Sequence, residues 1–223
     1  MFDWRWDFAF EILPRLLGAT VNTLIAAGLG YAIALVIGLV FALAQRTPSR
    51  ILTRCVREAV EFIRSTPLVL QIFFVFYVGP QFGIRLSPWT SGMIAIGLHY
   101  ASYLSEVYRA GIESVPKGQW EASRALNLSI VRTYSRVIIP QALPASLPGM
   151  GNYLVGIFKD TPMLSVIGVA ELMHTANALG SETYRFLEPY TMVGIIFLLI
   201  SLPTAAGLRA FEAWVRRALG MTR

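Results

Sequence analysis

The chain has 223 residues, of which 55% are hydrophobic and 14% are charged, and its formal net charge is +6. Soluble domains carry about 25% charged residues, so this composition argues against a soluble domain. The single cysteine, Cys55, excludes an internal disulfide, and we expect it to be inert.

Five uncharged runs are each long enough to cross a bilayer, since about 20 apolar residues span one as a helix. They cover residues 16–45, 65–84, 86–105, 137–158 and 189–208. We therefore expect an all-α integral membrane protein of about five transmembrane helices, built as a single domain over residues 1–223. The expected spans lie at 16–45, 65–84, 86–108, 137–158 with an irregular continuation to 178, and 189–212.

The N-terminal segment carries acidic residues at four-residue intervals, at Asp3, Asp7 and Glu11. It has no basic region followed by a small-residue cleavage site, so we expect no signal peptide. A helix here would place the acids on one face and Trp4 and Phe8 on a neighbouring face. Tryptophans gather at the headgroup level of membranes, so the segment predicts an interfacial helix.

Small residues repeat every four positions along the first span, at Ala26, Gly30, Ala34, Gly38 and Ala42. Such a seam lets a second helix approach closely. The partner helix belongs either to the same chain or to another subunit, and the pattern alone leaves both alternatives open.

Two segments interrupt the hydrophobic pattern in a similar way, FIRSTPLVL at 62–70 and IFKDTPMLS at 157–165. Proline suits the first turn of a helix and disrupts one that runs through it, so each Thr-Pro step is expected to open a new helical segment. Paired interruptions of this kind point to a binding site in transporters. The polar candidates for a substrate pathway at these breaks are Thr66, Gln71, Lys159, Asp160 and Thr161.

A zwitterionic substrate would suit the second of these breaks. Asp160 has the charge to contact a cationic nitrogen, and a helix that starts at Thr161 would aim its positive dipole end at a carboxylate. Two alternatives remain open. Lys159 and Asp160 would form an ion pair that ends the fourth span, or the repeated Thr-Pro would be a coincidence, since a third one stands at Thr47 in a loop.

The third span carries a polar stripe near its end. His99, Tyr103 and Glu106 follow one another at helical spacing and share a face, with Arg109 one turn further on. Glu106 and Arg109 are three residues apart and can form an ion pair. Glu106 is therefore a candidate for the substrate pathway, and the alternative is a satisfied polar stripe. His99 is interpreted as a hydrogen-bonded packing residue rather than a ligand.

A basic, amphipathic segment follows the third span. Ser114 is expected to cap a short helix over 117–126, with Pro116 in its first turn. Asn127 can adopt the left-handed conformation that ends helices, and Ser129 is a fair cap for a second helix leading back to the membrane. The segment therefore predicts a helix–turn–helix on the cytoplasmic face.

This helix–turn–helix would leave Trp120 and Leu126 available to a partner protein. An interfacial anchor held by the arginines of the segment is the alternative, and composition alone does not separate the two.

The basic residues are sorted by loop and do not form a nucleic-acid footprint. Fourteen of the 19 Lys and Arg residues fall within 46–64, 109–136 and 209–223, and the other five lie in the segments between them. Positive residues accumulate on the cytoplasmic side of membrane proteins. We therefore expect an outside N-terminus and a cytoplasmic C-terminus, as an odd number of spans requires.

The sequence Glu121-Ala122-Ser123, followed by Asn127 and by Val137, Ile139 and Pro140, resembles the EAA loop of bacterial ABC importer permeases. It departs from the family pattern at Ser123, Asn127, Val137 and Ile139, where the family has alanine, glycine, isoleucine and leucine. Asparagine keeps the left-handed turn accessible. The stretches at 61–77, 108–122 and 158–172 are similar to the polar amino-acid uptake branch for histidine, glutamate, glutamine and arginine. Residues 99–129 and 183–194 look most like an ectoine or hydroxyectoine permease.

The resemblance implies a type I ABC importer permease fold in a bacterial inner membrane. It implies a cytoplasmic coupling loop at 109–136 that contacts ATPase subunits through Gly118, Trp120, Glu121, Ala122 and Asn127. It further implies a second permease subunit, identical or homologous, and an extracytoplasmic solute-binding protein that delivers a small polar zwitterion.

The chain has no Gly-x4-Gly-Lys-Ser/Thr phosphate loop, so it does not bind ATP in that way and we expect no cofactor. It has no HExxH or GxSxG motif and no cluster of His and Cys, which argues against an intramembrane enzyme and against a metal site. The remaining alternative is an ion-coupled carrier or channel that works without partners.

Overall fold

The computed structural model describes residues 4–218, and every regular element in that part of the chain is helical. Asp3 and Arg223, which entered the N-terminal and charge predictions, lie outside the described residues. The helices are α1 (Trp6–Ala44), α2 (Arg50–Ser65), α3 (Leu68–Phe73), the π-helix η1 (Phe74–Val78), the 3₁₀ helix η2 (Gly79–Phe82), α4 (Pro88–Glu113), α5 (Lys117–Ala125), α6 (Ile130–Thr133), the π-helix η3 (Tyr134–Ile138), α7 (Ile139–Asp160), the 3₁₀ helix η4 (Thr161–Ile167), α8 (Leu172–Thr183) and α9 (Leu187–Ala218).

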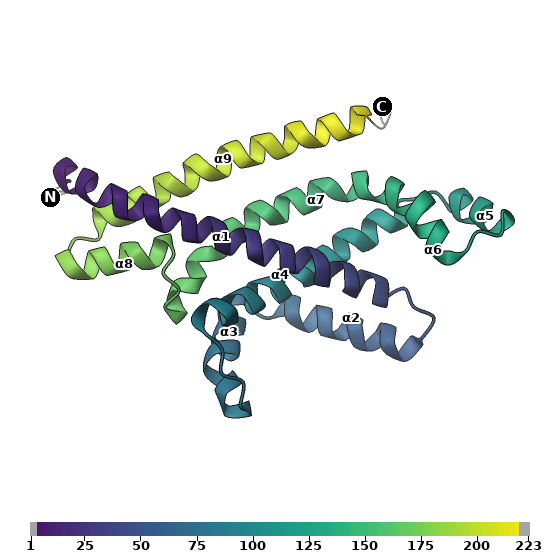
Figure 1. Ribbon diagram of the computed structural model, residues 1–223, viewed down its shortest axis with the longest axis horizontal. Coiled ribbons are helices and arrows are strands. Elements are labelled where there is room, and N and C mark those ends of the chain that lie inside the picture. Colours follow the sequence, from purple (N-terminus) through teal and green to yellow (C-terminus); the bar gives the residue numbers. More distant parts are fainter. Residues whose placement is uncertain (1–3, 219–223) are drawn as a thin grey trace.

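Long helices set the shape of the molecule. α1, α4, α7 and α9 run lengthwise, and α4 packs against both α1 and α7 (Figure 1). α5 and α6 lie at one end of the long axis, whereas α8 and the start of α1 lie at the other. The main apolar core forms where α1, α3, α4, α7 and η4 meet. The predicted all-α class is confirmed.

The small-residue seam of α1 packs on α4. Its alanines are completely buried. A Cβ atom added to Gly30 would lie 2.7 Å from Cγ2 of Ile96, and one added to Gly38 would lie 2.9 Å from the carbonyl oxygen of Ala101. The seam therefore brings together two helices of the same chain, which decides between the two alternatives left open by the pattern.

The N-terminal segment is not a separate interfacial helix. α1 begins at Trp6 and continues without a break for 39 residues, with Pro14 inside it. The aromatic residues Trp6 and Phe10 are exposed at its start. The acidic, tryptophan-containing segment and the first span are therefore one element.

The segment predicted as the second span is not one straight helix. α2 ends at Ser65, Thr66 is extended with φ −103° and ψ 132°, and α3 begins after Pro67. The residue before a proline is disfavoured in the helical conformation, which explains the break. The axis turns by 106° there. The part after the break, 68–82, reaches only about 22 Å at 1.5 Å per residue, which is less than the thickness of a bilayer core.

By length and composition, α1 and α9 can each cross a membrane, and two bent pairs of helices bring the total to as many as four spans within residues 4–218. The second pair bends by 47° between η4 and α8. α4 has 26 residues and is long enough to cross, but its serines, tyrosines and histidine make it more polar. Five spans therefore stay a prediction, with α4 as the additional one.

Candidate functional site

A pocket of about 500 Å³ lies between α4 and α7. It is lined by His99, Tyr100, Tyr103 and Val107 of α4 and by Gly149, Asn152, Tyr153, Gly156 and Asp160 of α7. These positions recur every three or four residues, so a single face of each helix lines the pocket. Convergent polar groups on such a concave surface define a candidate binding site.

Asp160 is the carboxylate of this pocket. Its Oδ2 atom accepts a hydrogen bond of 2.7 Å from the hydroxyl group of Tyr100. A carboxylate can accept several hydrogen bonds, so this contact orients Asp160 and leaves acceptor capacity for a cationic group. Asp160, the strongest pathway candidate from the sequence, therefore lies where a ligand would reach it.

Three tyrosines form one wall of the pocket. The ring centroids of Tyr100, Tyr103 and Tyr153 lie 5.4 to 6.2 Å apart, so the rings touch one another and leave no open cage between them. The faces of aromatic rings attract cations. The wall is thus suited to a positively charged group held beside it by Asp160.

His99 differs from its predicted role. The residue is 8% exposed, yet its Nδ1 atom has no hydrogen-bond partner among the described residues. The imidazole packs 5.5 Å from the ring of Tyr100 and 5.2 Å from the ring of Tyr103, measured between centroids. The prediction of a hydrogen-bonded packing residue is therefore wrong for that nitrogen.

Lys159 and Thr161 flank Asp160 but do not join it. Lys159 is exposed and lines an adjoining pocket of about 510 Å³ beside α9, and the described residues show no ion pair between it and Asp160. Thr161 is fully buried and donates its hydroxyl hydrogen to the carbonyl oxygen of Phe158 at 2.8 Å. A new helical segment, the 3₁₀ helix η4, begins at Thr161 with Pro162 in its first turn, as the Thr-Pro step predicts, but it follows α7 without a gap.

Thr66 and Gln71 are joined by a hydrogen bond at the first break. The side-chain amide of Gln71 donates to the carbonyl oxygens of Ile63 at 2.7 Å and Thr66 at 3.0 Å. Both residues line a mostly apolar cavity of about 320 Å³ beside α2 and α3, which does not include Asp160. The two interruptions that the sequence paired therefore do not form one site in the chain.

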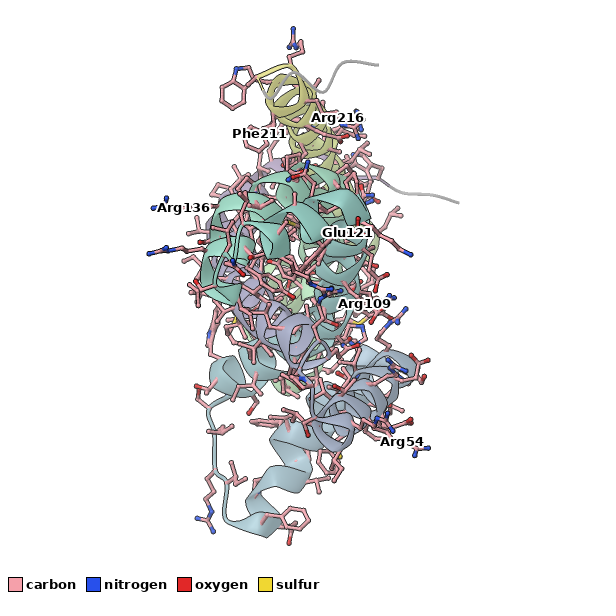
Figure 2. The ribbon with its side chains drawn as sticks, turned by 90° about the vertical axis from the view of Figure 1, so that its right-hand side faces the viewer. Arg54, Arg109, Glu121, Arg136, Phe211 and Arg216 are labelled. Atoms are coloured by element: carbon pink, nitrogen blue, oxygen red, sulfur yellow. The ribbon has the colours of Figure 1, made fainter. Side chains whose placement is uncertain are left out.

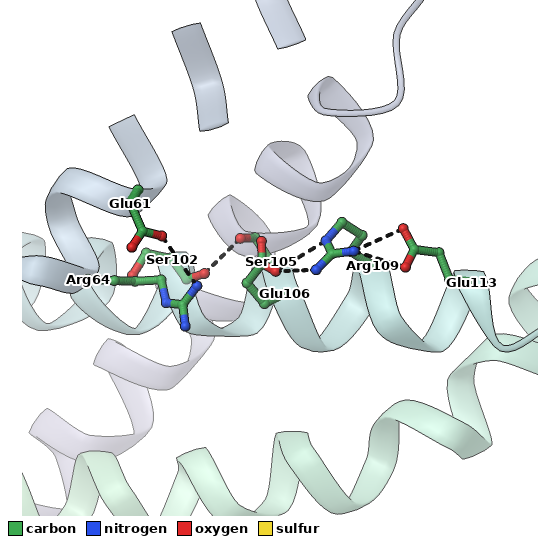
Figure 3. A network of polar contacts seen from close by, with 7 residues as sticks. All are labelled: Glu61, Arg64, Ser102, Ser105, Glu106, Arg109 and Glu113. Atoms are coloured by element: carbon green, nitrogen blue, oxygen red, sulfur yellow. Dashed lines mark hydrogen bonds and ion pairs between the residues drawn. The ribbon is translucent and has the colours of Figure 1, made fainter. Parts of the chain in front are cut away.

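Glu106 belongs to a row of alternating charges on α2 and α4 (Figure 3). Arg109 donates from Nε to Glu106 at 3.1 Å and pairs with Glu113 at 2.9 Å, so the predicted Glu106–Arg109 pair is confirmed. Arg64 lies over the ring of Tyr103, 5.2 Å from its centroid. The row thus contacts the tyrosine wall through Arg64, and Glu106 itself is not among the residues that line the pocket.

The loop after α4 has the predicted helix–turn–helix form. α5 ends just before Asn127, which has a positive φ of 50°, and Ser129 caps α6 by accepting from the backbone N–H of Arg132 at 3.4 Å. Ser114 is not the cap of α5. It ends α4 and donates to the carbonyl oxygen of Gly111 at 2.7 Å, because a proline already occupies the position before α5.

Trp120 is partly buried and packs within the loop. Its ring meets Tyr134 edge to face at 5.5 Å, and the guanidinium group of Arg46 lies 5.4 Å from its centroid. Leu126 is 71% exposed and remains available to a partner, as expected. The other predicted coupling residues are exposed at this end of the molecule: Gly118, Glu121, Ala122 and Asn127. In the view onto this end, Arg54, Arg136 and Arg216 point outward (Figure 2).

The sequence reasoning missed Tyr100, Asn152 and Tyr153. The signal was present, since Asn152, Gly156 and Asp160 recur every four residues on α7. The prolines of the fourth span predict an irregular helix, which hides this helical spacing in the sequence. In the structure, Pro144 and Pro148 lie inside a continuous α7.

Apolar helices around a polar pocket, with an amphipathic loop at one end, define a membrane transport subunit. Residues 34–217 match the family described as binding-protein-dependent transport system inner membrane components. The chain belongs to that family and is a multi-pass inner-membrane protein, and the expected ABC importer permease is confirmed.

Relatives match over nearly the whole chain. A protein of Sinorhizobium fredii described as a probable amino-acid ABC transporter permease is 42% identical, with 95% of each chain covered. An L-cystine permease protein of Bacillus subtilis is 36% identical, covering 95% of this chain and 93% of its own. A glutamine permease protein of Escherichia coli is 34% identical, covering 93% and 95%.

Solved structures share the fold. One from a crystal structure of an amino acid ABC transporter with histidines has a TM-score of 0.88 and 31% identity, covering 95% of this chain and 99% of its own. One from a methionine ABC transporter in an inward-facing form has a TM-score of 0.72 at 17% identity, covering 95% and 99%, and supports the fold alone.

Proposed function

We propose that this protein is one half of a permease dimer and that a small polar zwitterion, an amino acid or an amino-acid-like solute, passes through the pocket between α4 and α7. The other half is an identical or homologous chain. Cytoplasmic ATPase subunits hydrolyse ATP and bind at the loop around α5, and an extracytoplasmic binding protein delivers the substrate.

The contact between Asp160 and Tyr100 carries this proposal. A zwitterion needs an acceptor for its cationic nitrogen and a donor for its carboxylate. Asp160 supplies the acceptor, held in place by the 2.7 Å hydrogen bond and set beside the tyrosine wall. An ionisable side chain inside a membrane protein commonly marks a substrate pathway.

The connections of the two pocket helices support coupling to ATP hydrolysis. α4 ends at Glu113, and α5 begins at Lys117, so only three residues separate the pocket helix from the loop. On the other side, α6, η3 and α7 follow one another without a gap. A displacement of the loop therefore acts directly on both walls of the pocket.

We further propose that the N-terminus lies outside and the C-terminus in the cytoplasm, from the sorting of the basic residues. The coupling loop, 109–136, and the exposed arginines around it would then face the ATPase subunits. A membrane-impermeant thiol reagent tests this on intact spheroplasts. It should label a cysteine introduced at position 88 and not one at position 118, and the reverse result would contradict the orientation.

The substrate is best sought among amino acids and their cyclic relatives. Named relatives carry glutamine, L-cystine and nopaline in their descriptions. The resemblance of two stretches to ectoine permeases adds ectoine and hydroxyectoine, which are also small zwitterions. Substrate-stimulated ATPase activity of the assembled importer, screened with these compounds, identifies the one that is transported.

The decisive variant is Asp160→Asn in the assembled importer in proteoliposomes. Loss of a hydrogen bond to a charged group costs about 1.5–3 kcal/mol, so the half-saturating substrate concentration should rise roughly 10- to 100-fold while basal ATPase activity persists. Lys159→Gln, one residue away and outside the pocket, is the matched control. Unchanged half-saturation and maximal rate in Asp160→Asn would remove this pocket from the pathway.

A carrier or channel that works alone is the competing function. Liposomes that contain the purified chain without its partners should then take up substrate down an ion gradient. We expect no uptake in that experiment, and uptake there would replace the importer proposal.

A further inference from the structure

His99, one of the residues that line the pocket, has a buried polar atom without a hydrogen-bond partner among the described residues. The Nδ1 atom of His99 makes no hydrogen bond within residues 4–218, although the residue is only 8% exposed. Most buried polar side-chain atoms in proteins are hydrogen-bonded, and an exception calls for an explanation. A ligand that enters the pocket is the simplest one, because His99 lines the same space as Asp160.

Two hydroxyl donors of the pocket lining are already engaged. Tyr100 donates to Asp160 at 2.7 Å, and Tyr103 donates to the carbonyl oxygen of Arg64 at 3.4 Å. Thr161 bonds Phe158 and is fully buried away from the pocket. His99 is therefore the buried group of the lining with an uncommitted polar atom.

The charge of the lining decides what that nitrogen binds. Asp160 is the one carboxylate in the lining, so the cationic end of a zwitterion belongs there. The anionic end then requires a donor elsewhere in the pocket. A neutral imidazole has one N–H group, and its proton can reside on Nδ1.

We propose that His99 donates a hydrogen bond from Nδ1 to the carboxylate of the substrate, while Asp160 holds its cationic nitrogen. His99 is thus a specificity-determining residue that makes the pocket select zwitterions over cations of the same shape. This inference rests on the proposed function, because it places the substrate in the pocket between α4 and α7.

The test compares each amino acid with its carboxamide, which keeps the shape and removes the negative charge. The probe pairs are L-glutamine with L-glutaminamide and L-arginine with L-argininamide. Binding is measured by titration calorimetry on the assembled permease–ATPase complex without the binding protein, which has a recognition site of its own. The readout is the ratio of the two affinities, since a purely structural change alters both members of a pair alike.

Four variants test whether Nδ1 of His99 is the donor to the substrate carboxylate. His99→Asn keeps an amide nitrogen the same number of bonds from Cβ as Nδ1, and His99→Gln moves the same amide one bond further out. His99→Leu removes the donor. Tyr153→Phe, in the same pocket, removes a hydroxyl group but keeps the ring and serves as the control.

For at least one pair, the wild-type complex should prefer the amino acid over its amide by roughly 10- to 100-fold, the usual value of a hydrogen bond to a charged group. The ratio should fall toward one in His99→Leu and His99→Gln, and it should persist in His99→Asn and Tyr153→Phe. A wild-type ratio in both His99→Leu and His99→Gln, or no preference in the wild-type complex for either pair, overturns the proposal.

Asp160→Asn distinguishes failure of the His99 proposal from failure of the proposed function. If the pocket is not the substrate site, Asp160→Asn leaves the affinities for both members of each pair unchanged. If the pocket is the site and His99 does not bind the carboxylate, Asp160→Asn weakens binding while the His99 variants keep the wild-type ratio.

Discussion

The two faces of α4 are built in opposite ways. Toward α1, α4 packs closely on a seam of small residues, and Cβ atoms added to Gly30 and Gly38 of α1 would collide with α4. Toward α7, α4 presents His99 and two tyrosines that line a pocket of about 500 Å³, and Nδ1 of His99 has no hydrogen-bond partner among the described residues. The contrast indicates that α4 is fixed on α1 and that its other face is left open for a ligand.

The largest expected effect lies on the closed face. In Gly38→Val, a side chain would meet the carbonyl oxygen of Ala101 at 2.9 Å and the Cβ atom of Leu104 at 3.0 Å. Backbone atoms cannot move aside as a flexible side chain can, so stability should fall by about 1–3 kcal/mol or more. Gly28→Ala is the control, because nothing lies within 4 Å of its added Cβ atom. Thermal unfolding in detergent should show a large loss only in the first variant, and equal midpoints would contradict the tight seam.

The second-largest effect is expected in the coupling loop, 109–136, which connects the two helices of the pocket. Asn127 has a φ of 50°, which a β-branched residue resists strongly and glycine adopts freely. Asn127→Val should weaken binding of the ATPase subunits, and Asn127→Gly should retain it. Co-purification of the ATPase subunits measures this. Wild-type recovery with the valine variant would show that the left-handed turn does not position the loop.

A smaller effect is expected on the open face. A Cβ atom added in Gly156→Ala would lie 3.1 Å from the hydroxyl oxygen of Tyr100, at the free end of a side chain. Tyr100 can give way, so stability should change by less than about 1 kcal/mol. Its hydrogen bond to Asp160 should be disturbed, which raises the half-saturating substrate concentration by about tenfold or less. A stability loss as large as that of Gly38→Val would erase the distinction between the two faces.

The smallest effect is expected at an ion pair that lies on neither face of α4. Arg15 and Glu182 form an exposed ion pair of 3.0 Å between α1 and α8. Exposed pairs contribute about 0–1 kcal/mol, so Arg15→Gln should leave the unfolding midpoint and the uptake rate nearly unchanged. A large loss of either would mean that α8 is positioned by this pair rather than by its apolar core contacts.

The sequence predicted the closed face better than the open one. The four-residue repeat of small side chains encodes close packing directly, because each position needs only to be small. The pocket depends on residues of two helices that lie more than 40 positions apart in sequence, Val107 and Gly149 being the nearest, and on which ring turns toward which carboxylate. Asp160 was identified from its charge, whereas Tyr100 and Tyr153 became visible only when α4 and α7 were side by side.

The breaks were the least predictable feature. Both Thr-Pro steps look alike in sequence, yet one bends the chain by 106° and the other continues α7 into a 3₁₀ helix. The difference arises from the surroundings: Thr161 is fully buried, whereas Thr66 stands at a junction that the amide of Gln71 bridges. The local conformational preference of a Thr-Pro step does not reveal which of these surroundings it will have.

The contacts of Trp120 link the coupling loop to α1. Arg46, just beyond the end of α1, lies against the indole ring and donates from Nε to the hydroxyl group of Tyr134 at 3.2 Å. These contacts hold the C-terminal end of the 39-residue helix α1 against Trp120 of α5 and Tyr134 of η3. A displacement of the loop would therefore also act on α1, which reaches the opposite end of the molecule.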